Sequence, residues 1–347
     1  MSIKGGDCKM FEIKCGNAVD VLRSMPAESI DCCVTSPPYF NLRDYGVEGQ
    51  IGLETSVEEY IQKLVDVFNE VKRVLKPNGT LWLNIGDSRN GSGKGRNADG
   101  RVGKLNSTIQ NGNKGINSGR LSKTSVSKLK PKDLIGIPWM LAFALRDEGW
   151  YLRQDIIWEK PNCMPEAVKD RCTNCTEDIF LLSKSRYYYF DNEAIKEPCV
   201  GFDKSSPRGS KGALTPNAGR RKGNNKSFRG GGVYTNNRSF NNSADKSKET
   251  VGNVPNETGL RNRRNVWKIS TQGCKEAHFA TFPEKLAELC LLAGCPENGT
   301  ALDPFCGSGT VGVVAKRQNK NFIGIDINSD YCELSKRRIE NVRSKTD

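Results

Sequence analysis

Apolar residues recur along this chain with two different spacings, which alternate from one end of the chain to the other. Short apolar runs, which are typical of strands, cover 10–16, 29–35, 80–87, 151–158, 178–183, 299–305 and 321–327. Helical spacing covers 18–25, 56–76, 133–148, 282–294, 308–319 and 329–343. The alternation of strands and helices predicts an α/β fold with a mostly parallel sheet.

Local signals mark the ends of two of these helices. Ser56 can cap the helix at 56–76, Glu59 follows three residues later as in a capping box, and Pro77 is placed to stop the helix. Gly294 is placed to close the helix at 282–294.

The positive charge of the chain is concentrated in two segments. The chain has 53 Lys and Arg against 40 Asp and Glu, a net charge of +13. Residues 89–132 carry a net +10 and residues 185–265 a net +9, so the rest of the chain carries −6. Both segments are rich in Gly, Asn and Ser and poor in periodic apolar residues, which predicts long loops. They are either solvated linkers or, as we prefer, surfaces that contact a nucleic acid.

Several classes of protein are not expected. No apolar run reaches 18 residues, and the N-terminus has no apolar signal region, so neither a membrane span nor secretion is predicted. Cys32 and Cys33 are adjacent in a predicted strand and must point to opposite faces, so the 13 cysteines suit a reducing cytoplasm better than a disulfide framework. One CxxC (Cys172, Cys175) and one histidine (His278) predict no metal site.

A glycine-rich turn follows the predicted strand that ends at Asp303. It opens a helix, whose first amides are free to meet a ligand, and a second strand ends about 20 residues later at Asp326. Asp326 can accept hydrogen bonds from ribose hydroxyls, and an anionic Asp303 suits a ligand with a cationic amino group. Gly307, Gly309 and Gly312 also fit G-x-G-x-x-G, so a dinucleotide oxidoreductase is an alternative.

A second motif, Thr35-Ser36-Pro37-Pro38-Tyr39, directly follows the strand at 29–35. Two prolines remove two amide donors and hold the loop extended. The Ser36 hydroxyl and the Pro37 carbonyl can then accept the two hydrogens of a planar amine, and Tyr39 offers a ring face to a base. A plain Pro-Pro turn at a strand end is the simpler alternative.

Together the two motifs resemble those of the amino-methylating DNA methyltransferases that use S-adenosylmethionine. The FxGxG cofactor loop is Phe305–Gly309 and the [DNS]PP[YFW] target loop is Ser36–Tyr39, in the order of the permuted β group. The resemblance implies a Rossmann-like methyltransferase fold with a circularly permuted, mostly parallel seven-stranded sheet and basic loop insertions. It divides the chain into a catalytic half of the core (1–88), a basic flexible insertion (89–132), core strands and a helix (133–184), a target-recognition region (185–265) and a cofactor-binding half (266–347).

The resemblance also implies roles for single residues. Ser36, Pro37, Pro38 and Tyr39 form the catalytic loop around a flipped base, Asp303 contacts the methionine amino group, and Asp326 binds the ribose. Further cofactor contacts are implied at Asn17, Phe282, Pro283, Phe305, Gly307, Gly309 and Thr310. The residues expected to bind DNA are Arg220, Arg221, Lys222, Arg229, Arg238, Arg263 and Arg264.

The resemblance implies double-stranded DNA as the partner and a cytoplasmic location, for a protein encoded by a bacterium or a phage. A cognate restriction endonuclease that acts on the same site and a homodimer are both left open. Ser-Pro-Pro-Tyr is similar to the form that is commoner in N4-cytosine enzymes, which favours methylation of cytosine N4. Adenine N6 is the alternative within the family. Outside it, the alternatives are a nicotinamide-dependent oxidoreductase, a non-catalytic DNA-binding protein, and a methyltransferase of RNA or of protein glutamine.

Overall fold

The fold is taken from a computed structural model of the whole chain, which describes residues 10–42, 44–90, 129–199, 259–272 and 283–342. Contacts divide the chain into a large body, 1–195 with 264–347, and a smaller unit, 196–263. Most of the two basic segments lies outside the described residues.

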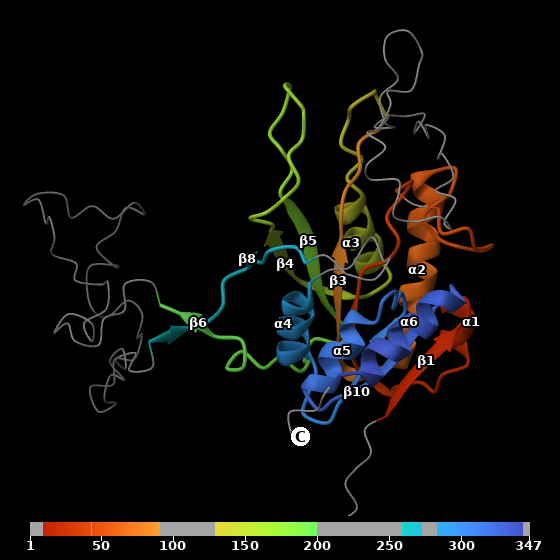
Figure 1. Cartoon of the computed structure of the whole chain (residues 1–347), viewed down its shortest axis with the longest axis vertical. Helices are drawn as coiled ribbons and strands as arrows, with labels where there is room; N and C mark the ends of the chain where they lie inside the picture. The colour runs from red at the N-terminus through yellow and green to blue at the C-terminus, as the bar shows by residue number, and fades with distance from the viewer. Residues whose placement is uncertain (1–9, 43, 91–128, 200–258, 273–282, 343–347) are drawn as a thin grey trace, which may run out of the picture. The chain divides into compact units, whose positions relative to one another are not determined.

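The body is built on one sheet of eight strands (Figure 1). Their order across the sheet is β1 (Phe11–Cys15), β10 (Asn321–Asp326), β9 (Thr300–Asp303), β2 (Ile30–Thr35), β3 (Leu75–Ile85), β5 (Thr176–Ser183), β4 (Tyr151–Glu159) and β8 (Val266–Lys268). The first five strands in this order, β1, β10, β9, β2 and β3, are parallel to one another. Strand β5 is antiparallel to both of its neighbours, and β8 is parallel to β4.

The predicted mostly parallel sheet is therefore confirmed, but the described residues give it eight strands instead of seven. The additional strand is β8, which has three residues and pairs with the end of β4 through Ile157, Trp158 and Glu159. A strand this short leaves no alternating pattern that a sequence can show, and only its pairing partner defines it.

Three helices cover each face of the sheet (Figure 1). The helices α1 (Ala18–Arg23), α2 (Val57–Val74) and α3 (Ile137–Asp147) contribute to one apolar core, and α4 (Glu284–Gly294), α5 (Thr310–Arg317) and α6 (Ser329–Glu340) to the other. Cys33 lies in the first core and Cys32 in the second, as expected for neighbours in a strand.

The start of α2 follows the prediction only in part. Ser56 caps the helix, because its hydroxyl accepts a hydrogen bond from the Glu59 amide at 3.1 Å. The Glu59 carboxylate instead accepts from the Thr55 hydroxyl at 3.2 Å, so this contact replaces the second half of the predicted capping box. The helix ends at Val74, before Pro77, because the chain is already extended at Leu75 where β3 begins.

Gly294 does not act as a left-handed helix cap. It is the last residue of α4, and it is not among the glycines with positive φ. A Cβ atom at this position would lie 2.2 Å from the Trp82 Nε1 atom and 2.8 Å from the Thr80 Oγ1 atom. The glycine is therefore required by the close approach of α4 to β3.

The described part of the smaller unit is a pair of short antiparallel strands, β6 (Glu197–Pro198) and β7 (Leu260–Arg261). Glu197 accepts a hydrogen bond from the Arg261 guanidinium at 3.0 Å and forms an ion pair with Arg263 at 3.9 Å. In the described part of the whole chain, no helix has the length and apolar character that crossing a membrane requires.

Candidate active site

The residues of both motifs lie at one edge of the sheet, because parallel strands end on the same side. Asn17 follows β1, Asp326 ends β10, Asp303 ends β9, and Ser36 follows β2. These four strands are neighbours, and the Gly16 amide bonds to the Asp326 carbonyl at 2.8 Å. Open α/β sheets bind their ligands beyond the carboxyl ends of the strands, so this edge is the expected place for a site.

A buried hydrogen bond joins the two motifs. The Thr35 hydroxyl, at the end of β2, donates to Oδ1 of Asp303, at the end of β9, over 2.7 Å. The Phe305 amide also donates to this oxygen, over 3.1 Å, whereas no described residue donates to Oδ2. Burial raises the pKa of Asp303 to about 7. A buried carboxylate with one unpaired oxygen suits a cationic group.

The glycine-rich turn is closed by the second carboxylate. Gly307 and Gly309 have φ angles of +51° and +78°, which side chains rarely adopt. The Gly307 amide donates to Oδ2 of Asp326 over 2.7 Å, and the Asn328 amide to Oδ1 over 2.9 Å. Burial raises the pKa of Asp326 above its ordinary value. Because a carboxylate accepts the turn amide that a pyrophosphate would need, the turn does not fit the dinucleotide alternative.

The other predicted cofactor residues have mixed placements. Asn17 caps α1, with its side-chain oxygen accepting from the Val19 amide at 2.9 Å. Phe305 is half-buried against the core, and the buried Thr310 hydroxyl lies 3.5 Å from that of Ser308. Pro283 is buried at the start of α4, and no described contact joins it to the strand ends. Phe282 lies outside the described residues.

The target loop presents acceptors. Ser36 is half-exposed, and no described residue donates to the Pro37 carbonyl. The Pro38 carbonyl, in contrast, accepts from the Tyr60 hydroxyl at 2.7 Å, which anchors the loop to α2. The loop therefore carries a hydroxyl and a carbonyl on consecutive residues, and the next carbonyl is held by Tyr60.

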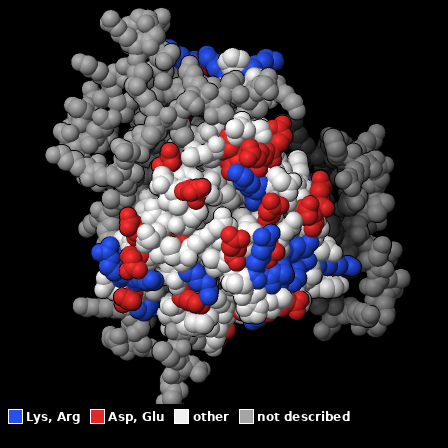
Figure 2. Space-filling view, turned by 90° about the vertical axis from the view of Figure 1, so that its right-hand side faces the viewer, with Lys and Arg blue, Asp and Glu red and all other residues white. Residues whose placement is uncertain are grey.

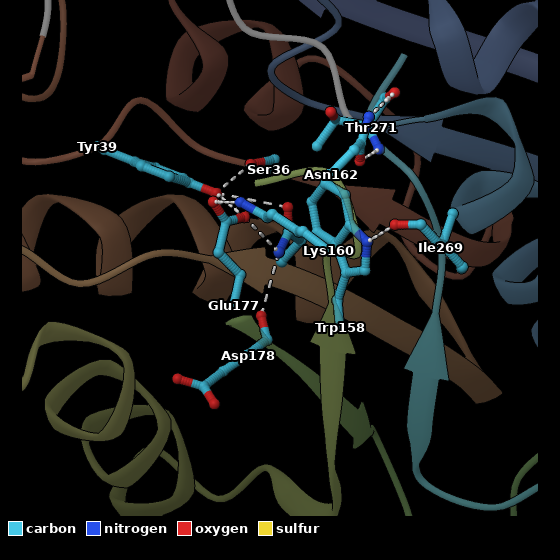
Figure 3. Close-up of polar contacts among 10 residues, drawn as sticks. Ser36, Tyr39, Trp158, Lys160, Asn162, Glu177, Asp178, Ile269 and Thr271 are labelled. Carbon is cyan, nitrogen blue, oxygen red and sulfur yellow. Dashed lines mark hydrogen bonds and ion pairs between the residues drawn. The ribbon is translucent and has the colours of Figure 1, made fainter. Parts of the chain in front are cut away.

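The Tyr39 hydroxyl points toward Glu177, a residue of β5 (Figure 3). A Cβ atom on Gly86 would approach the Tyr39 ring to 2.7 Å, so the glycine makes room for the ring. The Tyr39 hydroxyl donates to Oε2 of Glu177 at 2.8 Å and lies 3.5 Å from Oγ of Ser36. Burial first, and the Glu177 charge second, raise the pKa of Tyr39 well above its ordinary value, so this phenol stays protonated.

Three further residues of this edge were not predicted: Asn84, Lys160 and Glu177. Lys160 forms an ion pair with Glu177, and Asn84 donates to Glu177 at 3.2 Å. The sequence predicts a strand at 178–183, but nothing in this segment shows that β5 is antiparallel to β3. That pairing brings the beginning of β5 to the edge where β3 ends. An acidic residue opening an apolar strand was the only available signal.

Five of the predicted DNA-binding residues lie outside the described residues: Arg220, Arg221, Lys222, Arg229 and Arg238. Arg263 forms the ion pair with Glu197, and the Arg264 carbonyl accepts from the Trp267 indole at 3.0 Å. Cys172 and Cys175 are free thiols, and within the described ranges no three potential metal ligands cluster.

Fold and site together define an α/β protein that carries two aspartates at neighbouring strand ends, beside a Ser-Pro-Pro-Tyr loop. Comparison with known proteins agrees with this class. Residues 30–337 match the N6_N4_Mtase family model, described as DNA methylase. The chain is 42% identical to the type II methyltransferase M.SmaI of Serratia marcescens over 93% of this chain and 89% of that protein. It is 39% identical to the type II methyltransferase M.Cfr9I of Citrobacter freundii over 94% and 86%.

Solved structures share the fold at low sequence identity. The PvuII cytosine-N4-specific DNA methyltransferase gives a TM-score of 0.56 at 17% identity, over 96% of this chain and 88% of that one. A DNA modification methylase of Thermus thermophilus, solved with S-adenosylmethionine, gives 0.52 at 19% identity over 96% and 95%. This chain therefore belongs to the N4/N6 amino DNA methyltransferase family.

S-adenosylmethionine is the methyl donor of this family and the cofactor of this chain. The residues present fit it, because the buried Asp303 carboxylate can accept from a cation, the partly buried Asp326 carboxylate can accept from hydroxyl donors, and the turn glycines keep the backbone free of side chains. The cofactor supplies an electrophilic methyl group on a sulfonium.

Proposed function

We propose that this chain is a site-specific methyltransferase of duplex DNA that methylates the exocyclic N4 amine of cytosine. The observation that carries the proposal is the pair of acceptors, Ser36 Oγ and the Pro37 carbonyl, at the strand end next to Asp303. Serine at the first loop position favours N4 of cytosine over N6 of adenine. The names of M.SmaI and M.Cfr9I as type II methyltransferases support a role in restriction and modification, with a cognate endonuclease and a cytoplasmic location.

The mechanism that we propose is direct transfer to a flipped base. A stacked cytosine cannot reach a donor at the sheet edge, so the base leaves the helix and enters the site. Tyr39 offers the exposed part of its ring as a stacking surface. Ser36 and Pro37 accept the two amine hydrogens, which holds the nitrogen lone pair out of the ring system and directs it at the methyl group.

The cofactor residues act by positioning. Asp303 holds the cationic amino group through Oδ2, to which no described residue donates, and Asp326 accepts from the ribose hydroxyls while its position is fixed by the Gly307 and Asn328 amides. Direct transfer needs no covalent link between enzyme and base. Cys199, a candidate nucleophile by type, lies in the smaller unit beside Gly259 and has no role in this proposal.

Methyl transfer to DNA tests the proposal directly. The protein is incubated with isotopically labelled S-adenosylmethionine and bacterial DNA, the DNA is digested to nucleosides, and the labelled nucleoside is identified by mass. We expect N4-methyl-2′-deoxycytidine, and sequencing of the methylated DNA gives the recognition site. N6-methyl-2′-deoxyadenosine would instead establish the alternative within the family, and an unlabelled digest would overturn the proposal.

A matched pair of variants ties the activity to the loop. Ser36→Ala removes one of the two acceptors, and we expect the transfer rate to fall by about 10- to 100-fold, as for other single positioned hydrogen bonds. Cofactor affinity should stay within twofold. Ser29→Ala, just before the opposite end of β2, removes a hydroxyl that bonds, among the described residues, only to the Pro26 carbonyl, and it should leave the rate unchanged.

A further inference from the structure

A largely buried ion pair lies behind the target loop. Glu177 opens β5 and Lys160 follows β4, and their side chains are 16% and 18% exposed. Glu177 uses both oxygens: Oε1 accepts from Lys160, and Oε2 accepts from the Tyr39 hydroxyl at 2.8 Å and from Asn84 Nδ2 at 3.2 Å (Figure 3). The pair therefore contacts the loop through Tyr39.

The Lys160 ammonium is itself held in place. It lies over the Trp158 ring at 4.5 Å from the centroid, and the Trp158 indole donates to the Ile269 carbonyl at 2.8 Å. Two residues after Lys160, Asn162 is joined to Thr271 by two hydrogen bonds. The Thr271 amide donates to the Asn162 side-chain oxygen at 2.8 Å, and the Asn162 side-chain nitrogen donates to the Thr271 carbonyl at 3.2 Å. The Lys160 cation is thereby held in its ion pair with the largely buried Glu177 carboxylate.

The Glu177 carboxylate sets the direction of the hydrogen bonds that connect it to Tyr39 and, through Tyr39, to Ser36. An ionised carboxylate only accepts, so the single Tyr39 hydroxyl hydrogen must point at Glu177. The distances agree, since Oδ1 of Asn84 is 3.4 Å from this hydroxyl and Glu177 only 2.8 Å. The Tyr39 oxygen is then an acceptor for the Ser36 hydroxyl, 3.5 Å away.

Asn84 closes the same arrangement. Its amide nitrogen donates to Glu177 and, over 3.2 Å, to the Asp178 carbonyl, which fixes the amide with its oxygen on the Tyr39 side. The Ser36 hydrogen is therefore directed at the Tyr39 oxygen, which leaves the lone pairs of the Ser36 oxygen available as acceptors.

We propose that the Lys160–Glu177 pair is a positioning and specificity element that makes the target loop an acceptor-only surface, so that the site takes an exocyclic amine and rejects a ring carbonyl. The inference rests on the proposed function. A pyrimidine that carries a carbonyl at C4, such as uracil or thymine, would place an acceptor against Ser36 Oγ and the Pro37 carbonyl. A site built around one hydrogen-bond pattern rejects the opposite pattern strongly, because buried polar groups are left unpaired.

Glu177→Gln tests this inference, because an amide can donate to Tyr39 and so reverses the chain of hydrogen bonds. We expect the single-turnover methylation rate to fall by about 10- to 100-fold, with cofactor affinity measured by calorimetry unchanged. Lys160→Arg keeps the cation and should retain most activity, whereas Lys160→Met should behave like Glu177→Gln. Glu159→Gln, which removes a 2.9 Å ion pair to Lys268 outside this network, is the matched control and should stay within twofold.

A double-mutant cycle separates positioning from a merely structural role. Tyr39→Phe keeps the ring but removes the hydroxyl, so adding Glu177→Gln in this background should cost less than threefold. An equal cost in both backgrounds would show that Glu177 acts without Tyr39 and would overturn the inference.

Base discrimination gives a readout that does not depend on turnover. Duplexes with cytosine or uracil at the mapped target position are compared for binding to the protein loaded with S-adenosylhomocysteine, which has no methyl group to transfer. The wild type should prefer cytosine, and Glu177→Gln should reduce that preference about tenfold. An unchanged preference refutes the inference even if the rate falls. If the wild-type protein methylates cytosine while Glu177→Gln behaves like it, only this inference fails; if the wild type transfers no methyl group, the proposed function fails first.

Discussion

Two carboxylates at neighbouring strand ends differ in what already surrounds them. Both oxygens of Asp326 accept backbone amides, whereas Asp303 keeps Oδ2 without a described donor. Burial raises both pKa values, and that of Asp303 reaches about 7. At neutral pH the free protein therefore holds a proton on a large fraction of its Asp303 side chains, and a cationic ligand must displace that proton.

The affinity for S-adenosylmethionine should therefore depend on pH through Asp303. Its carboxylate is charged above pH 7 and protonated below, so binding should weaken about eightfold from pH 7.5 to pH 6 and release a proton. Calorimetry in buffers of different ionisation enthalpy measures both effects. Asp303→Asn should bind weakly with a flat profile. Asp178→Asn should keep the wild-type profile, although the pKa of Asp178 is about 6, raised first by burial and then by nearby carboxylates. A flat profile for the wild type would exclude Asp303 from contact with the amino group.

At the scale of helices and strands, the close approach of α4 to β3 is possible because Gly294 has no Cβ atom. Trp82 and Thr80 of β3 occupy the space that a side chain at Gly294 would need. Alanine is the better helix former by about 1 kcal/mol, so propensity and packing predict opposite effects of the same substitution.

Gly294→Ala should lower the free energy of unfolding by about 1–3 kcal/mol, because packing outweighs propensity at a fully buried contact. Urea unfolding, followed by circular dichroism, measures the change. Lys285→Ala, on the exposed side of α4, removes a 3.0 Å surface ion pair with Glu288 and should change stability by less than about 0.5 kcal/mol. A stabilised Gly294→Ala protein would mean that α4 can move away from Trp82.

The sequence predicted correctly those features that depend on residues close to one another along the chain. The helices follow from apolar spacing and caps, and Ser56 marks the start of α2 correctly. The parallel strand ends brought Ser36, Asp303 and Asp326 together as expected, because parallel order alone puts them at one edge. Glu177 was missed because the antiparallel pairing of β5 with β3 placed the beginning of β5 at this edge. Neither spacing nor composition states which strand reverses.

Across the whole molecule, charge separates the described body from the basic segments. The chain outside 89–132 and 185–265 has a net charge of −6. Figure 2 shows acidic and basic side chains interspersed on one face, with neither sign forming a broad continuous area. A surface of this kind offers little attraction to phosphates, so DNA affinity should come from the basic segments.

Replacing Arg220, Arg221 and Lys222 with serine therefore tests where DNA is held. Each lost phosphate contact makes the slope of log affinity against log salt concentration shallower by about 1. The slope of the triple variant should therefore be shallower by up to about 3, and this variant should bind DNA more weakly at low salt. Fluorescence anisotropy over a salt series measures both quantities, and cofactor affinity should not change.

The control removes three cations from exposed positions of the body, Arg23, Lys285 and Lys336, each of which forms only a surface ion pair among the described residues. It changes the net charge by the same amount, so a general loss of attraction would affect both variants equally. If contact is local, the control should keep the wild-type slope to within about 1. Equal slopes for the two variants would mean that net charge, and not the segment around Arg220, determines binding, and this part of 185–265 would then be a linker.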